Sequence, residues 1–377
     1  MGKRIFLSPP LMNGTETEYI NSAFKSNRVA PFGHNTELFE RSVRNYLGCR
    51  HSLALSSGTA GIHISLRYLG VEPGDVVFCS SLTFAASCMP ILYECAEPVF
   101  IDSDSDSWNM SPSALRTALE RYSALGRLPK AVVVADIYGL PAKYDEILSI
   151  CVEFKVPVVE DAAEALGSAY KGKMCGTYGD IGVLSFNSNK IITTSGGGMV
   201  VTDIDGATDK MKYWSAQSRE PLPYYEHREI GYNYRLSDIC AGIGRGQMNS
   251  IERYIERRRE INGFYRREFA GYPVSFPNEI VGAKSNCWLS VILIENGVPP
   301  SMVIEALERD NIEARRCWKP MSRQPVFKDC EFFACPGADN SSVGDELFAK
   351  GLCLPSGTAM DDEDLRRIVG IVKKAIT

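Results

Sequence analysis

The chain has 377 residues, of which 45% are hydrophobic and 23% charged, a balance typical of a globular protein with more than one core. Its formal net charge of −5 at pH 7 argues against a nucleic-acid-binding protein, which carries an excess or a stripe of basic residues. No apolar run approaches the roughly 18 residues of a membrane span, so we expect no membrane contact and a cytoplasmic protein without a signal peptide.

The cysteines and histidines give no sign of disulfide bonds or of a metal site. The sequence contains 12 cysteines and no Cys-x-x-Cys pair. Cys79, Cys95 and Cys353 are among those that lie inside apolar runs, and we expect reduced thiols in the core. The four histidines are not spaced as metal ligands, so no metal is expected.

The first two thirds of the chain alternate short apolar runs with helical patterns. The runs predict strands at residues 75–80, 98–102, 131–136, 156–161, 181–186 and 198–203. Several runs are continuous rather than alternating, as in strands buried on both faces of a mostly parallel sheet. Helical spacing predicts helices at residues 59–69, 112–122 and 144–154, the second with Ser111 as its N-cap. This order predicts an open α/β sheet.

The pattern changes near residue 245. Apolar residues from Met248 to Tyr265 predict one long amphipathic helix. Strands are expected at 274–276 and 288–295, and a helix at 302–308. A last helix begins with acidic residues at 361–364 and ends with lysines, which suits the helix dipole. We therefore predict a large α/β domain over residues 1–245, and a linking helix with a smaller α+β domain over residues 246–377.

One lysine stands where catalytic chemistry is expected. Lys190 follows a predicted buried strand, which ends near Ser185, and precedes the glycines at 196–198. Most lysines in such positions are solvated loop residues, but a desolvated lysine can bond covalently to an aldehyde cofactor. The glycines would allow the backbone to approach such a site closely.

Three further groups also follow the ends of predicted strands. Ser57, Gly58 and Thr59 lead into a helix, whose N-terminal N–H groups suit a phosphate, although Ser and Thr are also common N-caps. Phe84 could stack on a flat ring or belong to the core. Asp161 could pair with a protonated ring nitrogen at the sheet edge or cap the next segment.

On these residues the chain resembles the DegT/StrS family of sugar aminotransferases. The resemblance runs over the whole chain and includes residues 57–59, 160–164, 185–190 and 231–236. It implies a pyridoxal-phosphate-dependent transferase of fold type I, with a large, mostly parallel sheet domain and a smaller C-terminal α+β domain. The branch that makes UDP-4-amino-4,6-dideoxy-N-acetylglucosamine, in the bacillosamine pathway, is the most similar at residues 7–10, 190–199, 318–321 and 353–360.

The resemblance implies roles at matching positions around pyridoxal 5'-phosphate. Lys190 would hold the cofactor and move protons, Asp161 would pair with its ring nitrogen, and Glu164 would lie near its ring hydroxyl. Phe84 would stack on the ring. The residues expected around its phosphate are Ser57, Gly58, Thr59 and Ser185.

The resemblance also implies a homodimer with shared active sites. Asn233 matches an asparagine that reaches the phosphate of the neighbouring subunit's cofactor. A nucleotide-sugar is expected against two segments, formed by Asn27, Arg28, Val29, Ala30, Trp318, Lys319, Pro320 and Met321. Arg28 and Ser322 depart from the family pattern, which more often has an apolar residue and a histidine there. Three arginines are candidates for contacts with carboxylate or diphosphate groups of the substrates: Arg219, Arg235 and Arg316. Each could instead form only a salt bridge at the surface or at an interface.

The implied reaction moves an amino group from L-glutamate to C4 of a UDP-linked 4-keto-6-deoxy-N-acetylhexosamine. The product would be a UDP-4-amino-sugar for glycan biosynthesis. A GDP- or dTDP-linked keto-sugar remains an alternative. A pyridoxal-phosphate-dependent sugar dehydratase is another, although that branch of the family has histidine in place of the lysine. A nucleotide-sugar-binding protein without catalysis is the third.

Overall fold

The computed structural model describes residues 2–278, 280–335 and 342–377. Its largest sheet has the strand order β1-β9-β8-β5-β4-β2-β3-β14. β9 (Gly198–Thr202) is antiparallel to both of its neighbours, β1 (His51–Leu55) and β8 (Ile181–Ser185). All other pairs are parallel. The carboxyl ends of the parallel strands therefore meet at one edge. These strands also include β2 (Val76–Ser80), β3 (Glu97–Ile101), β4 (Ala131–Ala135), β5 (Val158–Asp161) and β14 (Phe332–Phe333).

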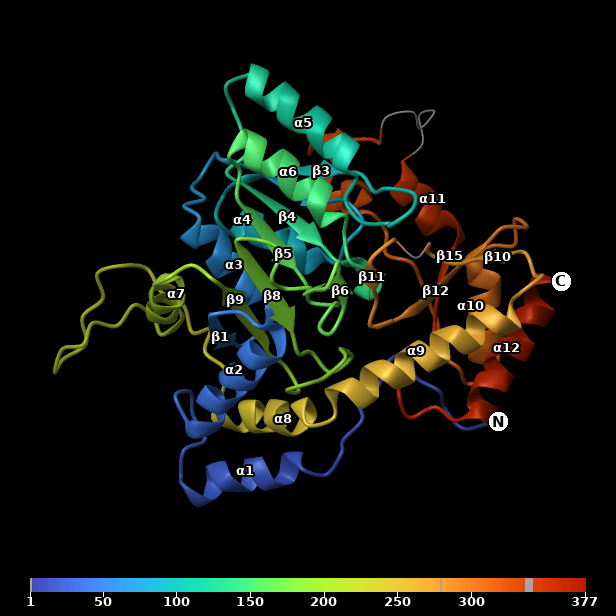
Figure 1. Ribbon diagram of the computed structural model, residues 1–377, viewed down its shortest axis with the longest axis horizontal. Coiled ribbons are helices and arrows are strands. Elements are labelled where there is room, and N and C mark those ends of the chain that lie inside the picture. Colours follow the sequence, from blue (N-terminus) through green and yellow to red (C-terminus); the bar gives the residue numbers. More distant parts are fainter. Residues whose placement is uncertain (1, 279, 336–341) are drawn as a thin grey trace.

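Helices cover both faces of this sheet (Figure 1). Alternate side chains of β2 point to opposite faces: Val77 and Cys79 pack with α3 (Gly58–Tyr68), whereas Val76 and Phe78 pack with α5 and α6. The six predicted strands and three predicted helices of this region are confirmed to within two residues at each end. Ser111 caps α5 as expected, because its Oγ accepts the Ala114 N–H at 3.3 Å. The helices of this part are α1 (Glu16–Lys25), α2 (His34–Leu47), α4 (Met89–Tyr93), α5 (Pro112–Ala124), α6 (Tyr144–Phe154) and α7 (Ala207–Ser215).

The predicted long helix is in fact two helices. Met248 ends α8 (Asp238–Met248), and α9 (Ile251–Glu268) begins after Asn249 and Ser250. The prediction of one continuous helix was wrong, because Asn and Ser side chains compete for backbone hydrogen bonds and favour a break. Figure 1 shows α9 running from the large sheet toward α10 and α12.

The C-terminal part forms a small sheet with the order β10-β12-β15-β13, and helices pack against it. The predicted elements of this part are found, and Asp361 starts the last helix with a capping box. β14 leaves this part and pairs with β3 of the large sheet. The elements are β10 (Val274–Ser275), β12 (Ser290–Ile294), α10 (Pro300–Arg309), β13 (Arg315–Arg316), α11 (Val343–Lys350), β15 (Gly351–Leu354) and α12 (Asp362–Ile376). A third sheet contains β6 (Ala169–Tyr170), β7 (Lys173–Met174) and β11 (Ala283–Lys284).

Two sequence expectations concern the chain as a whole. Among the described residues, no helix is both long and apolar enough to span a membrane. Cys79 and Cys353 are reduced thiols and are buried as expected. Burial of Cys95 was a wrong prediction, because this residue is exposed in the turn after α4, where its φ is 55°.

Candidate active site

A cavity of about 410 Å³ lies at the carboxyl ends of the parallel strands. We call it the cofactor cavity. The structure brings together the groups that follow β1, β2, β5 and β8 in the sequence. The sequence-predicted residues that line it are Ser57, Gly58, Thr59, Phe84, Asp161, Glu164, Ser185, Lys190 and Trp318.

Lys190 places a sheltered amine in this cavity. Its side chain is only 11% exposed, and its Nζ lies 3.5 Å from Glu164 Oε1. The same Nζ lies 4.2 Å from the centroid of the Trp288 ring. The backbone N–H of Lys190 donates to Asn187 O at 3.0 Å, which fixes the turn after β8. A primary amine with one carboxylate and one aromatic face beside it is therefore held against the cavity.

Glu164 is buried and is held in place from the opposite side by Tyr138. The Tyr138 N–H donates to Glu164 Oε2 at 2.7 Å. Burial raises the pKa of Glu164, and the nearby Lys190 charge opposes this rise. Tyr138 has a φ of 55°, in the left-handed region, so its turn needs support. Asn109 supplies this support, because it accepts the Ile137 N–H and donates to Leu140 O, both at 2.8 Å.

Asp161 ends β5 with its carboxylate in the cavity wall. Ser87 Oγ donates to Asp161 Oδ2 at 2.5 Å, and the Ala163 N–H donates to Oδ1 at 3.1 Å. Burial raises the pKa of Asp161, while the Ser87 hydrogen bond lowers it in part. The carboxylate is thus an oriented charge that the protein itself only partly compensates.

The turn between β1 and α3 offers backbone donors to the cavity. Ser57 Oγ caps α3 by accepting the Ala60 N–H at 3.0 Å. A Cβ added to Gly198 would lie 2.4 Å from Gly58 N, so only glycine allows β9 to approach this turn. Ser185 also abuts the turn, 3.3 Å from the position of a Cβ on Gly58. The N-terminus of α3, with Ser57, Thr59 and Ser185 around it, suits a phosphate dianion.

Pyridoxal 5'-phosphate matches this set of groups. The α3 N-terminus could hold its phosphate, the carboxylate of Asp161 could pair with its ring nitrogen, and the amine of Lys190 could bond to its aldehyde carbon. Phe84 lines the cavity with a ring that is 59% exposed and free to contact a flat ligand. The fold and the site therefore define a pyridoxal-phosphate-dependent enzyme of fold type I.

Several sequence-predicted residues lie outside this cavity. Asn233 is exposed and forms a backbone bridge with Ala216. Residues 27–30 form an exposed loop after α1. Lys319, Pro320 and Met321 follow Trp318 but do not line the cavity; the Met321 N–H donates to Ser81 O at 2.7 Å.

The three candidate arginines also lie elsewhere. Arg219 lies over the Tyr225 ring, and Arg316 donates to Phe348 O at 2.8 Å. Arg235 is buried, with its Nη2 3.9 Å from Glu40 and its guanidinium 4.8 Å from the centroid of the Phe32 ring; its Nε and Nη1 have no hydrogen-bond partner among the described residues. Their roles toward a substrate stay predictions.

Three residues that contact the catalytic candidates were not predicted from the sequence: Ser87, Trp288 and Tyr138. Ser87 lies four residues after Thr83, whose Oγ1 lies 2.5 Å from Ser87 Oγ, but a lone serine in this stretch gives no signal. Trp288 was assigned only to a strand, and Tyr138 to no element. Each contacts Lys190 or Glu164 across more than 25 residues of sequence, so only the fold reveals it.

Comparison with known proteins identifies the family. The sequence profile of the DegT/DnrJ/EryC1/StrS aminotransferase family matches residues 10–373. EpsN of Bacillus subtilis (strain 168), whose name describes a pyridoxal phosphate-dependent aminotransferase, is 47% identical over 99% of this chain and 96% of its own. A GDP-perosamine synthase of Escherichia coli O157:H7 is 31% identical over 96% of both chains.

Two further comparisons agree. A UDP-4-amino-4,6-dideoxy-N-acetyl-beta-L-altrosamine transaminase of Campylobacter jejuni (strain 81-176) is 34% identical over 68% of this chain and 67% of its own. The crystal structure of an aminotransferase of the same family from Brucella abortus superposes with a TM-score of 0.88 at 28% identity, covering 96% of this chain and 95% of that one. The chain belongs to the DegT/DnrJ/EryC1/StrS family and is a pyridoxal-phosphate-dependent sugar aminotransferase.

Proposed function

We propose that this enzyme transfers the amino group of L-glutamate to C4 of a UDP-linked 4-keto-6-deoxy-N-acetylhexosamine. The observation that carries the proposal is the sheltered amine of Lys190, which faces a cavity that also presents a helix N-terminus and the Asp161 carboxylate. A nucleotide-sugar-binding protein without catalysis would need none of these three groups. A dehydratase of this family is disfavoured because position 190 is lysine.

The residues of the chain divide the catalytic work. Pyridoxal phosphate, when bound, supplies an electron sink for bond breaking at the amino-acid α-carbon. Asp161, oriented by Ser87, would keep the ring nitrogen protonated by its negative charge. Lys190 would bond the cofactor at rest and, once displaced, move a proton to or from the substrate carbon. Glu164 lies 3.5 Å from that amine and would orient it.

Trp318 is the residue of the cofactor cavity that we expect to contact the sugar substrate. Its indole Nε1 is buried and has no hydrogen-bond partner among the described residues. A buried donor without an acceptor costs free energy unless a ligand supplies one, and sugar hydroxyl and carbonyl oxygens are suitable acceptors. The Trp318 ring also lies 6.4 Å from the Phe84 ring, centroid to centroid. We therefore place the keto-sugar between the cofactor ring and Trp318.

A second copy of the chain would complete the site. The segment after α7 projects from the molecule (Figure 1), and it carries Tyr225 and Ile230, which are 76% and 75% exposed. Large exposed apolar side chains on a projecting arm are typical of an interface between subunits. Asn233 lies exposed at the base of this arm, where it could reach the cofactor phosphate of a neighbouring subunit.

Product analysis with a panel of keto-sugars tests the substrate. The purified enzyme, with pyridoxal phosphate and L-glutamate, would be offered 4-keto-6-deoxy sugars linked to UDP, dTDP and GDP. Amination at C4 of the UDP-linked N-acetylhexosamine is the expected result. The similarity to the Campylobacter jejuni transaminase, which is named for a UDP-linked amino-sugar, supports this expectation. Preference for the GDP-linked sugar would instead support the alternative suggested by the GDP-perosamine synthase. No amination of any member would contradict the proposed function.

A further inference from the structure

His63 is a buried histidine of α3 to which the proposed mechanism gives no role. It lies on the helix that begins at the cofactor cavity, and it is only 4% exposed. Its Nε2 lies 3.0 Å from Glu94 Oε1, at the end of α4. Its Nδ1 is hydrogen-bonded to Tyr234 Oη, also at 3.0 Å. The imidazole therefore joins α3 to two segments that are distant in sequence.

Contacts on several sides hold the imidazole of His63 in one orientation. Both ring nitrogens have polar neighbours, Glu94 on one side and Tyr234 on the other. The rings of Tyr93 and Tyr232 lie 5.3 and 4.8 Å from the imidazole, centroid to centroid. A side chain that is fixed in this way can determine where the Tyr234 side chain lies relative to α3.

The tyrosines on either side of Asn233 are both held by α3. Besides the contact of His63 with Tyr234, Arg67 Nη1 donates to Tyr232 Oη at 2.9 Å. His63 and Arg67 are four residues apart and so lie on one face of the helix. The rings of Tyr232 and Tyr234 are stacked, with 4.8 Å between their centroids. Because alternate residues of an extended segment point to opposite sides, Asn233 faces away from α3, in keeping with its exposure.

The same segment supports the turn of the cofactor cavity that suits a phosphate. Tyr234 O accepts the N–H of Ser56, a residue that lines the cavity, at 2.8 Å. Ser57 follows and caps α3. The Tyr234 N–H donates to Ser215 O at 3.0 Å, which fixes the segment at the end of α7. The contacts therefore form a closed ring, from His63 through Tyr234 to Ser56, and along the turn back into α3.

We propose that His63 is a positioning residue for the phosphate of pyridoxal 5'-phosphate. Its hydrogen bond to Tyr234 fixes the segment that supports Ser56, so the turn between β1 and α3 keeps its backbone donors directed into the cavity. Donors that are already oriented bind a phosphate more tightly, because less conformational entropy is lost on binding. The inference rests on the proposed place of the phosphate at the N-terminus of α3, and it adds a residue that does not itself line the cavity.

Comparison of pyridoxal 5'-phosphate with pyridoxal, which lacks the phosphate, tests the proposal. The full-length protein, freed of cofactor, is titrated with each compound, and the absorbance of the lysine-bound form gives the dissociation constant. His63→Leu and Tyr234→Phe should each weaken the binding of pyridoxal 5'-phosphate about fivefold, through one lost hydrogen bond. The binding of pyridoxal should change by less than about twofold in both variants, because it has no phosphate to lose contacts.

Two further variants separate positioning from a general loss of structure. The double variant His63→Leu, Tyr234→Phe should bind about as weakly as His63→Leu alone, because both changes break the same hydrogen bond. The matched control is His51→Leu, at the start of β1, where His51 Nε2 lies 2.9 Å from Asp205 Oδ1. It should leave both dissociation constants unchanged. Tyr234→Phe removes a single hydroxyl group, so it decides the test by itself if His63→Leu does not fold.

The outcomes separate this proposal from the proposed transamination. Equal weakening of both compounds would overturn it, because a loss that does not depend on the phosphate is a general structural effect. Parent-like affinity of Tyr234→Phe for pyridoxal 5'-phosphate would overturn it too. Both results leave the transamination standing, since amination of the keto-sugars is measured separately. A parent protein that binds pyridoxal as tightly as pyridoxal 5'-phosphate would instead overturn the phosphate site on which both proposals depend.

Discussion

One amine and two carboxylates line the cofactor cavity, on Lys190, Asp161 and Glu164. Their charges affect both the stability of the protein and its binding of the cofactor. Burial raises the pKa of both carboxylates. Each therefore costs stability when it is ionised in a protein without cofactor. A bound cofactor with a protonated ring nitrogen would pair with Asp161 and offset this cost.

Replacement of Lys190 by Ala should abolish transamination. The variant loses both the covalent attachment point and the proton carrier, and the second loss alone is worth about 10²–10⁴-fold in rate. The measurements are the rate of amino-sugar formation and the absorbance of the lysine-bound cofactor. Lys173→Ala, which changes an exposed lysine of β7, is the control and should keep the parent rate. Substantial activity in Lys190→Ala would remove this residue from the mechanism.

Asp161→Asn should stabilise the protein that lacks cofactor while it removes activity. Because burial raises the folded-state pKa of Asp161 above its unfolded value, the folded state binds more protons between the two values. The contribution of Asp161 to stability is present below the unfolded pKa and is lost as pH rises through the folded pKa. Asparagine carries no charge, so the stability advantage of the variant should grow between pH 4 and pH 8.

Thermal unfolding of the cofactor-free proteins across that pH range checks this prediction. Asp209→Asn, at an exposed position of α7, serves as the control and should leave the pH dependence unchanged. Equal melting temperatures for Asp161→Asn and the parent at pH 8 would show that Asp161 is not a costly charge.

At the scale of elements, the strands and helices of the large sheet could be predicted because their residues carry a local pattern. The runs around Val132 and Val200 are continuous because both faces of the sheet are covered. β14 could not be predicted, because two residues, Phe332 and Phe333, pair with β3 only through distant sequence. Ser87 and Trp288 could not be predicted as site residues for the same reason, because they contact the site through residues distant in sequence. Lys190 and Asp161 could be predicted, because they follow or end predicted strands.

Asp102 connects the large sheet to α11, and its loss should destabilise the fold. Its buried carboxylate accepts hydrogen bonds from Ser342 Oγ, the Val343 N–H, the Gly344 N–H and the Cys335 N–H, at 3.0 to 3.3 Å. Asp102→Ala would leave these donors without an acceptor, at a cost of about 2–4 kcal/mol in the free energy of unfolding.

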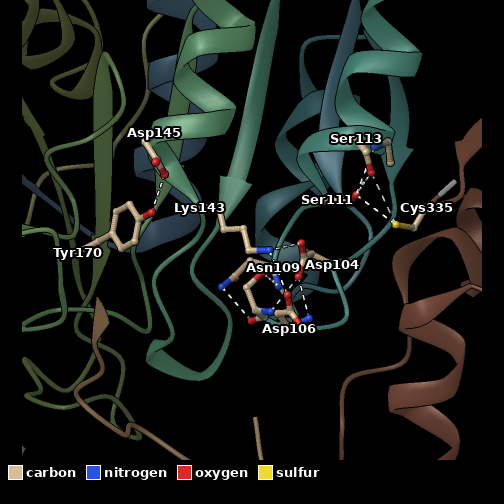
Figure 2. A network of polar contacts seen from close by, with 11 residues as sticks. Asp104, Asp106, Asn109, Ser111, Ser113, Lys143, Asp145, Tyr170 and Cys335 are labelled. Carbon is tan, nitrogen blue, oxygen red and sulfur yellow. Dashed lines mark hydrogen bonds and ion pairs between the residues drawn. The ribbon is translucent and has the colours of Figure 1, made fainter. Parts of the chain in front are cut away.

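Urea unfolding measures this change. Asp106→Ala is the matched control four residues away, because the Asp106 side chain is exposed and, within residues 2–278, 280–335 and 342–377, forms an ion pair with Lys143 alone (Figure 2). It should change the free energy of unfolding by less than about 1 kcal/mol. An equally small change in Asp102→Ala would show that the carboxylate does not hold α11 to the sheet.

At the scale of the whole molecule, the proposed dimer predicts complementation between two inactive variants. Lys190→Ala and Asn233→Ala would each impair every site in their own homodimers. If Asn233 serves the neighbouring subunit, a mixed dimer has one site with both changes and one site with neither. The mixed dimer, isolated from its two parent homodimers, should then have about half of the parent activity, from its one intact site of two. The mixed dimer is made by co-expression of two differently tagged chains and is assayed after purification through both tags in sequence. Activity no higher than that of the separate variants would contradict shared sites.

The proposed mechanism requires a covalent bond between the amine of Lys190 and the aldehyde carbon of pyridoxal phosphate. Borohydride reduction of the purified protein with excess cofactor, followed by mass spectrometry of its peptides, measures this bond. We predict one reduced pyridoxyl adduct, at Lys190. A protein without an adduct, or with the adduct at another lysine, would contradict the central claim.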